Sequence, residues 1–160
     1  RPWPPLPVEI WGASVQSLMW AGHLARQVRP DFTTEEWTPG GTSAWGDRID
    51  TCLVNYYAHD ARLGWHVDQT EKDRHSPIVT FSVGASAVFM VRVEHRGELV
   101  TQSHILRSGD VIVMAGKARL AEHCVHSIEI DDQSQLFADN YNPIRESRSR
   151  LSFTVRSTGL

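Results

Sequence analysis

The spacing of hydrophobic residues changes near residue 50 from a helical period to a strand period. Before it, apolar and small residues recur at intervals of three and four from Ser14 onward, which predicts a helix that ends at Pro30. Residues 1–13 are rich in proline and tryptophan, so we expect them to be extended or turn-like. Residues 31–50 contain Pro39-Gly40-Gly41 and are expected to form a long loop.

After residue 50, short runs rich in valine, isoleucine, phenylalanine and threonine alternate with turn residues, which is typical of strands. The expected strands are 52–57, 63–68, 78–83, 87–93, 99–106, 111–114, 124–130 and 149–156. Short strands at this spacing predict a mainly β fold of the jelly-roll type, with the N-terminal helix packed outside it. Residues 131–148 are expected to form a second long, polar loop.

Length and composition restrict the class of protein further. The 160 residues fit one domain, with 1–50 as helical and loop support and 51–158 as the β-core. With 41% hydrophobic and 22% charged residues, wholesale disorder is excluded, and no apolar run is long enough for a membrane span. Cys52 and Cys124 alone exclude a disulfide scaffold and favour a reducing, intracellular setting. The start at Arg1, without a signal peptide, indicates a fragment of a larger protein.

The first candidate for chemistry is the run His66-Val67-Asp68 in an expected strand. Residues two apart in a strand point to the same face, so His66 and Asp68 offer an imidazole and a carboxylate side by side. This pair suits a metal that accepts nitrogen and oxygen ligands, although a solvated polar pair has the same pattern. By the same alternation Trp65 faces away from His66 and is expected in the core.

A third metal ligand is expected well downstream, at His123, where another strand begins. Two histidines and one carboxylate form the facial triad of non-haem Fe(II) oxygenases, which leaves positions open for a cosubstrate and O₂. His126 is a rival for His123. The remaining histidines lie in the helix or in polar and turn contexts, where solvation is expected: His23, His59, His75, His95 and His104.

The last strand places Arg150 and Arg156 on one face, opposite Leu151, Phe153 and Val155. An inward-facing arginine needs a partner, because an unpaired buried charge is very costly, and a dicarboxylate held by the guanidinium fork would be such a partner. A solvent-facing strand is the alternative. Two further residues on one strand face, Asn55 and Tyr57, could donate hydrogen bonds to carboxylate oxygens, unless that face is wet.

The order of these motifs is itself informative. The matching segments are Arg1-Pro-Trp-Pro-Pro-Leu-Pro, Asn55-Tyr56-Tyr57, Leu63-Gly64-Trp65-His66-Val67-Asp68, Ser76-Pro77-Ile78-Val79, Phe81-Ser82-Val83-Gly84, Ser108-Gly109-Asp110-Val111, Arg119-Leu120 before His123, and the strand from Arg150 to Arg156. Taken together, they resemble the AlkB family of Fe(II)- and 2-oxoglutarate-dependent dioxygenases, which reverse alkylation of nucleic-acid bases. The resemblance covers residues 50–130 and 149–158.

The resemblance implies a double-stranded β-helix, with Fe(II), 2-oxoglutarate and O₂ as cofactors. The implied iron ligands are His66, Asp68 and His123. The residues implied for 2-oxoglutarate are Arg150, with Asn55 and Tyr57 helping, and Arg156 near the cosubstrate and the base pocket. The implied reaction is oxidative demethylation of N-alkylated bases in DNA or RNA, in which a hydroxylated N-methyl group leaves as formaldehyde.

Three features depart from the family pattern. Ser152 stands where the family commonly has asparagine, and Thr70, followed by Glu71, stands where some members have an acidic residue that contacts the methylated base. The run from His66 to Glu71 is closer to homologues associated with methyladenine in DNA or transfer RNA than to the bacterial repair enzyme. The family's substrate lid has no counterpart in this sequence, so a missing segment or a partner is expected to supply it to a monomeric chain.

The expected partner is nucleic acid, either single-stranded or with a flipped-out base. The net charge of −3 excludes a strongly basic nucleic-acid binder but not a local basic face, and Arg145 and Arg148 are expected to contact phosphates. The acidic balance also keeps open a 2-oxoglutarate oxygenase that acts on a protein or a small molecule. A non-catalytic jelly-roll binding module is the alternative from a different class.

Overall fold

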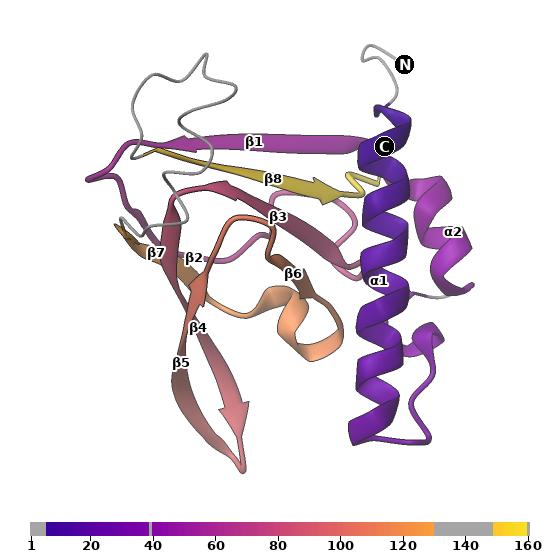
Figure 1. The fold of residues 1–160 in the computed structure, drawn as a ribbon. Helices are drawn as coiled ribbons and strands as arrows, with labels where there is room; N and C mark the ends of the chain where they lie inside the picture. Colours follow the sequence, from indigo (N-terminus) through magenta and orange to yellow (C-terminus); the bar gives the residue numbers. More distant parts are fainter. Residues whose placement is uncertain (1–5, 39, 130–148, 160) are drawn as a thin grey trace.

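The computed structural model describes residues 6–38, 40–129 and 149–159 (Figure 1). Its helical elements are α1 (Val8–Val28), η1 (Thr34–Glu36), α2 (Gly41–Arg48) and η2 (Gly116–Leu120). Its strands are β1 (Thr51–Tyr57), β2 (Leu63–His66), β3 (Ile78–Gly84), β4 (Ser86–His95), β5 (Glu98–Leu106), β6 (Val111–Met114), β7 (His123–Glu129) and β8 (Arg150–Arg156). The expected loop 131–148, with Arg145 and Arg148, lies outside the described residues.

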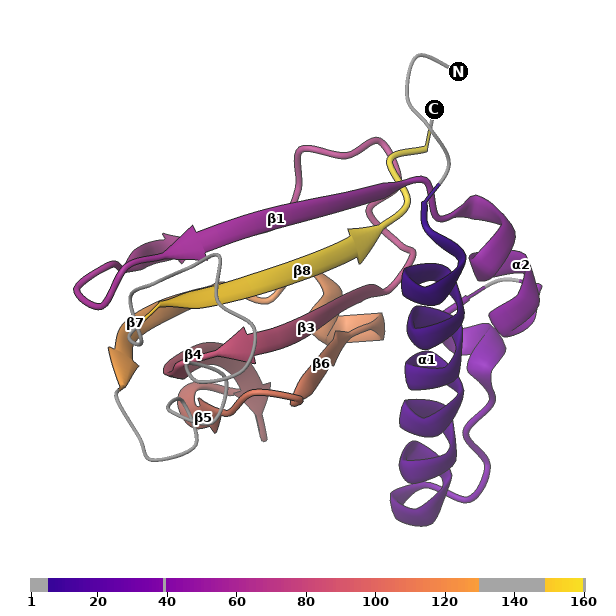
Figure 2. The same cartoon turned by 45° about the horizontal axis from the view of Figure 1, so that its top comes forward.

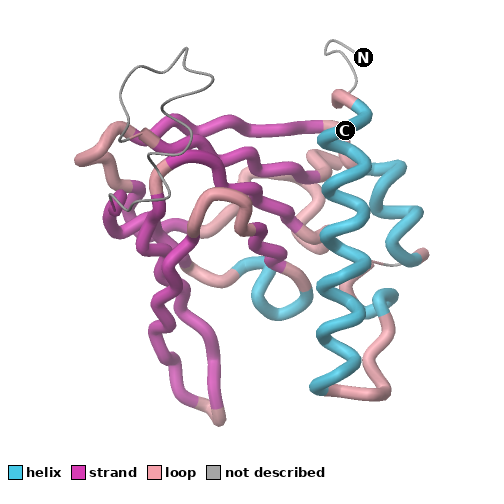
Figure 3. Tube along the Cα trace, in the orientation of Figure 1, coloured by secondary structure: helices cyan, strands magenta, loops and turns pink. Residues whose placement is uncertain are grey.

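Two antiparallel sheets of four strands form the β-core, which confirms the predicted jelly roll with its flanking N-terminal helix. Sheet I has the strand order β1-β8-β3-β6, and sheet II has the order β2-β7-β4-β5. Strands that are consecutive in sequence, such as β2 and β3, lie in different sheets, whereas β4 and β5 form a long hairpin that projects from the body (Figures 1 and 3). All the predicted strands are present, with ends shifted by up to two residues.

The first helix begins earlier than predicted. We expected it from Ser14, but α1 begins at Val8, directly after Pro7. Proline is compatible with a helix start because its φ is already fixed and its missing N–H would be unpaired there. Tertiary contacts hold the added turns, because the indole N–H of Trp11 donates to the carbonyl of Gly46 at 2.9 Å.

The expected long loop over 31–50 is wrong in part, since it contains η1 and α2. A capping box between Thr33 and Glu36 starts η1. The sequence pattern placed Gly40 in a loop. In the structure Gly40 has a φ of 88° and directly precedes α2. The short helix is stabilised by Trp45, which is 0% exposed and donates its indole N–H to the carbonyl of Pro77 at 3.1 Å.

The helices cover one end of the outer face of sheet I. Figures 1 and 2 show α1 running across this end of the sheet with α2 beside it. Leu18 of α1 and Trp45 of α2 pack in one cluster with Val79 of β3 and Val155 of β8. Because strand residues alternate, the neighbours of these two valines face the space between the sheets. In the described part of the chain no helix is long and apolar enough to cross a membrane.

Candidate active site

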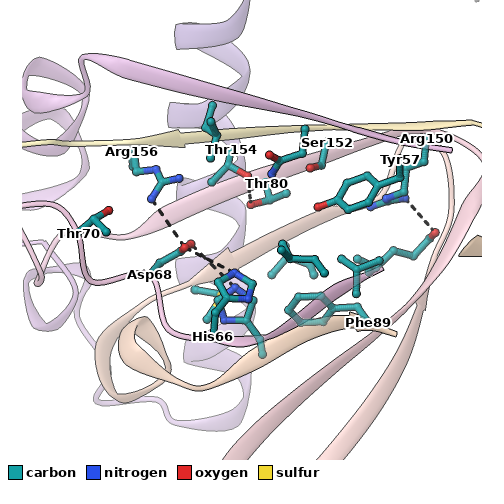
Figure 4. Close-up of a pocket in the computed structure, with 18 residues that line it drawn as sticks. Tyr57, His66, Asp68, Thr70, Thr80, Phe89, Arg150, Ser152, Thr154 and Arg156 are labelled. Carbon is teal, nitrogen blue, oxygen red and sulfur yellow. Dashed lines mark hydrogen bonds and ion pairs between the residues drawn. The ribbon is translucent and has the colours of Figure 1, made fainter. Parts of the chain in front are cut away.

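A cavity of about 290 Å³ lies between the two sheets, where the inward faces of their strands meet (Figure 4). One end holds polar groups from β2, β7 and the loop after β2, and the other holds groups from the start of β8 and the end of β1. The lining residues are Leu53, Asn55, Tyr57, Leu63, His66, Asp68, Thr70, Thr80, Phe89, Leu106, Ile112, Met114, His123, Val125, Arg150, Ser152, Thr154 and Arg156.

His66, Asp68 and His123 meet at one end of this cavity. Their ligand atoms all lie within 4.8 Å of one another. The Nε2 atoms of His66 and His123 lie 3.8 Å and 3.9 Å from the two oxygens of Asp68. The two imidazoles come together because His66 ends β2 and pairs directly with His123 at the start of β7. This set of two nitrogens and one carboxylate is suited to a divalent transition metal.

Both histidines are oriented by the same backbone contact. The Nδ1–H of His66 donates to the carbonyl of Gly64 at 2.8 Å, and the Nδ1–H of His123 donates to the carbonyl of Ala121 at 2.9 Å. A carbonyl oxygen only accepts, so Nδ1 carries the proton and Nε2 keeps its lone pair for a metal. Burial lowers the pKa of His123, which is 7% exposed, and favours the neutral ring that binds metals.

Asp68 reaches the site from a loop, not from the strand that we predicted. β2 ends at His66, so the alternation of a strand does not place the carboxylate. Instead, Arg119 of η2 donates to the backbone carbonyl of Asp68 at 2.6 Å and to the carbonyl of Ser76 at 2.7 Å. From the sequence we assigned no role to Arg119, and no local pattern indicates its burial, because charged Lys117 and Glu122 lie close to it in the chain.

Arg156, at the end of β8, lies at the end of the cavity that holds the cluster of His66, Asp68 and His123, which we call the metal end, and not beside Arg150. Its guanidinium lies 3.8 Å from an oxygen of Asp68 and forms a hydrogen-bonded ion pair with Glu71. The pKa of Glu71 is lowered. Burial alone would raise this pKa, but hydrogen bonds and the nearby charges of Arg156 and Arg119 outweigh burial. Thr70 lines the cavity and donates its hydroxyl to Glu71 at 3.0 Å.

Arg150 is 2% exposed and lies at the end of the cavity opposite the histidines (Figure 4). Its guanidinium donates to Ser82 Oγ at 2.6 Å and to the carbonyls of Ala85 and Leu106 at 3.3 Å and 3.4 Å. All these partners are neutral, and its Nε has no hydrogen-bond partner among the described residues. Burial lowers the pKa of Arg150, and the opposing effects of Tyr57 and Asp110 do not outweigh it.

Pairing between strands β1, β8 and β3 brings the remaining predicted residues to the side of the cavity that holds Arg150. Tyr57 pairs with Arg150, and Asn55 pairs with Ser152, whose other neighbour is Ser82. All but Ser82 line the cavity. In the sequence Ser82 is part of the motif Phe81-Ser82-Val83-Gly84, and we assigned it no role of its own. It shares a strand face with Thr80, so the alternation along β3 could have identified both as inward-facing residues.

The structure separates the rival histidine from the site. His126 is exposed, whereas His123 is buried in the cavity wall. The five histidines expected to be solvated are exposed as well. The prediction that Trp65 lies in the core is wrong, because its half-buried ring lies under the guanidinium of Arg92, 4.1 Å from the ring centroid. A cation over an indole face stabilises such an intermediate position.

Comparisons with known proteins agree with this geometry. Residues 1–156 match the model of the 2OG-Fe(II) oxygenase superfamily. A DNA N(6)-methyladenine demethylase, ALKBH1D of Arabidopsis thaliana, is 39% identical over 108 residues, covering 65% of this chain and 24% of the relative. The alpha-ketoglutarate-dependent dioxygenase AlkB of Salmonella typhimurium is 30% identical over 129 residues, covering 81% of this chain and 50% of the relative.

The chain thus spans 24% of the length of the first of these curated relatives and 50% of the second. Among solved structures, OsALKBH1 superimposes with a TM-score of 0.72 at 24% sequence identity, over 96% of this chain and 67% of the other, and so shares the fold. With a family model matched from residue 1 to residue 156 on a jelly roll of this kind, the chain belongs to the 2OG-Fe(II) oxygenase superfamily, as a member of its AlkB family.

Proposed function

We propose that the chain is the catalytic core of an Fe(II)- and 2-oxoglutarate-dependent dioxygenase that oxidatively demethylates N-alkylated bases in nucleic acid. One observation carries the proposal: a cluster of His66, Asp68 and His123 shares a cavity with a buried arginine, Arg150, that has no anionic partner among the described residues. A metal and a dicarboxylate that bridge these two ends would satisfy both.

The metal would be held by Nε2 of His66, Nε2 of His123 and the carboxylate of Asp68. The two Nδ1–H groups are already engaged by backbone carbonyls, so the rings would not reorient when they bind the ion. Arg156 would hold Asp68 in place through its 3.8 Å contact while its main partner is Glu71. Three protein ligands leave coordination positions for 2-oxoglutarate and O₂.

The far carboxylate of 2-oxoglutarate would sit against Arg150. The Nε of this residue, unpaired among the described groups, offers a donor, and Ser82 together with two backbone carbonyls fixes the plane of the guanidinium. Two neutral donors would add to this contact: Tyr57, which pairs with Arg150 across the strands, and Asn55, which lies two residues before Tyr57. This assigns Arg150, Tyr57 and Asn55 to the cosubstrate.

When bound, iron with O₂ and 2-oxoglutarate supplies the oxidation: one oxygen atom enters succinate as CO₂ leaves, and the other is inserted into a C–H bond of the N-methyl group. The protein's part is to bind, orient and exclude water. Apolar side chains that include Phe89, Leu106 and Met114 line the cavity and keep bulk water from the reacting centre. The hydroxymethylated base then releases formaldehyde and returns to its unmodified form.

A nucleic-acid substrate is supported by the relative named a DNA N(6)-methyladenine demethylase. Thr70 lines the metal end of the cavity, where a base would enter, and supplies a neutral hydroxyl. A protein or small-molecule substrate is the second candidate, because the chain has a net charge of −3 and phosphate contacts favour basic surfaces. The lid that grips the substrate is expected to come from outside these 160 residues.

The test is turnover with a panel of oligonucleotides that carry single N-methylated bases, measuring succinate and formaldehyde. We expect both products in equal amounts from at least one methylated base, and neither from His123→Ala. The matched control is His126→Ala on the same strand, which should keep wild-type rates because its side chain is exposed. Succinate formation stimulated only by peptides or small molecules would favour the second candidate, and no succinate under any condition would indicate a binding module.

A further inference from the structure

One buried guanidinium organises the loop that carries the carboxylate of the metal cluster. Arg119 is 2% exposed. Its Nε donates to the carbonyl of Ser76 at 2.7 Å, and its two terminal nitrogens donate to the carbonyls of Asp68 and Asp73 at 2.6 Å and 3.3 Å. All three carbonyls belong to one segment, the loop between β2 and β3.

This loop lacks the backbone partners that regular structure would give it. Residues 67–77, all of them in the described part of the chain, form neither helix nor strand. Buried carbonyls still need donors, and a guanidinium with five N–H groups in a rigid fork can serve several of them at once. A fourth guanidinium contact, 3.7 Å to the carboxylate of Glu71, holds the middle of the loop to the same side chain.

Arg119 also connects two of the clustered residues. It lies in η2, which leads through Ala121 into His123, and the carbonyl of Ala121 accepts the Nδ1–H of His123. The residue whose guanidinium binds the backbone carbonyl of Asp68 is thus only four residues from His123 in the sequence. Motion of η2 relative to the loop would separate the carboxylate from the imidazole.

We propose that Arg119 is a positioning residue of the metal centre, which sets the separation of Asp68 from His123 by holding the backbone of the β2–β3 loop against η2. Arg119 does not touch the metal in this account; it acts through three backbone carbonyls and its contact with Glu71. The inference rests on the proposed function, since it assigns the cluster to a metal. Lysine cannot replace the fork, because one ammonium cannot reach three carbonyls in fixed directions.

The experiment is a titration of the purified chain with Mn(II), in which the EPR signal of the free ion reports binding without any turnover. Arg119→Met is expected to bind Mn(II) about 10–100-fold more weakly than the wild type, as is common when a residue that orients a ligand is lost. Arg119→Lys keeps the charge and should still bind several-fold more weakly. It also serves as the second variant if Arg119→Met does not fold.

Two controls separate positioning from general loss of stability. Lys117→Met changes an exposed cation on the same short helix and should bind Mn(II) as the wild type does. Val79→Ala removes volume from the cluster under α1, away from the cavity lining, and should lower the melting temperature but not the Mn(II) affinity.

Three other results would count against the inference. Wild-type Mn(II) affinity in either Arg119 variant overturns it, and so does an equal loss of affinity in Val79→Ala, because stability alone would then explain the effect. If the wild type itself binds no Mn(II), the proposed function fails first and the inference fails with it, which distinguishes the two cases.

Discussion

Replacing Arg150 by alanine should remove 2-oxoglutarate binding and leave metal binding nearly intact. The two functions are separable because Arg150 begins β8 and Arg156, which contacts Asp68, ends it. With a strand rise of roughly 3.3 Å per residue, their backbones are about 20 Å apart. The substitution should therefore leave His66, Asp68 and His123 in place.

The magnitude follows from how Arg150 is held. Its guanidinium is 2% exposed and its present partners are neutral, so a carboxylate would gain a desolvated, charge-assisted contact that water does not screen. Truncating one partner of such a pair costs about 2–5 kcal/mol. At about 1.4 kcal/mol per factor of ten, the dissociation constant should rise by about 30-fold to several thousand-fold. Arg150→Lys should also bind poorly because it lacks the fork.

The assay is calorimetric titration of 2-oxoglutarate into Mn(II)-loaded protein, with thermal unfolding as a second readout. For the wild type, a ligand concentration of 100 times the dissociation constant should add about 2.7 kcal/mol of stability, and Arg150→Ala should lose most of this gain at the same concentration. The Mn(II) affinity is the internal control. If 2-oxoglutarate affinity in Arg150→Ala stays within about threefold of the wild type, below the range expected from the pair, Arg156, Arg145 or Arg148 becomes the better candidate.

Other substitutions test the fold and its pH dependence. Gly84→Ala should destabilise the chain by about 1–3 kcal/mol in urea unfolding, because φ is +89° and a Cβ would lie 2.5 Å from the carbonyl oxygen of Ser149; an unchanged midpoint would contradict this. Trp45→Ala should cost about 3–5 kcal/mol, since the side chain is 0% exposed, while the Mn(II) affinity of the folded variant stays unchanged. Asp73→Asn should cost about 1–2 kcal/mol at pH 7 after allowance for solvent screening. Burial alone would raise the pKa of Asp73, but hydrogen bonds from Ser76 and the backbone of His75 hold it at about 2, below its ordinary 3.8. The stabilisation is therefore present above pH 4 and lost as the pH falls through about 2, so the two proteins should differ at pH 7 and converge near pH 2; a constant difference across this range would refute the assignment.

A strand such as β8 could be predicted from sequence because its two faces lie in different environments. In β8, Val155 packs under α1 while Arg150 and Ser152 line the cavity, so the alternation of residue types reports the two environments directly. The short helix α2 could not be predicted in this way. Its burial depends on Trp45 reaching Pro77, far along the chain, and no local pattern records that contact.

The same distinction holds in the candidate site. His66 is placed by a strand, and its pairing with His123 follows from sheet register. Asp68 was assigned to the right cluster for the wrong reason, because it lies beyond the strand and depends on Arg119. The partners of Arg119 are 43, 46 and 51 residues away in sequence, so its role is visible only once the chain is folded.

The most direct test of the account is diffraction at the iron absorption edge from crystals of the chain grown without oxygen, with Fe(II) and 2-oxoglutarate. We expect one anomalous peak about 2.0–2.3 Å from Nε2 of His66, Nε2 of His123 and a carboxylate oxygen of Asp68. In the same map the far carboxylate of 2-oxoglutarate should lie against the guanidinium of Arg150. An iron peak elsewhere, or 2-oxoglutarate bound away from Arg150, would contradict the central claim.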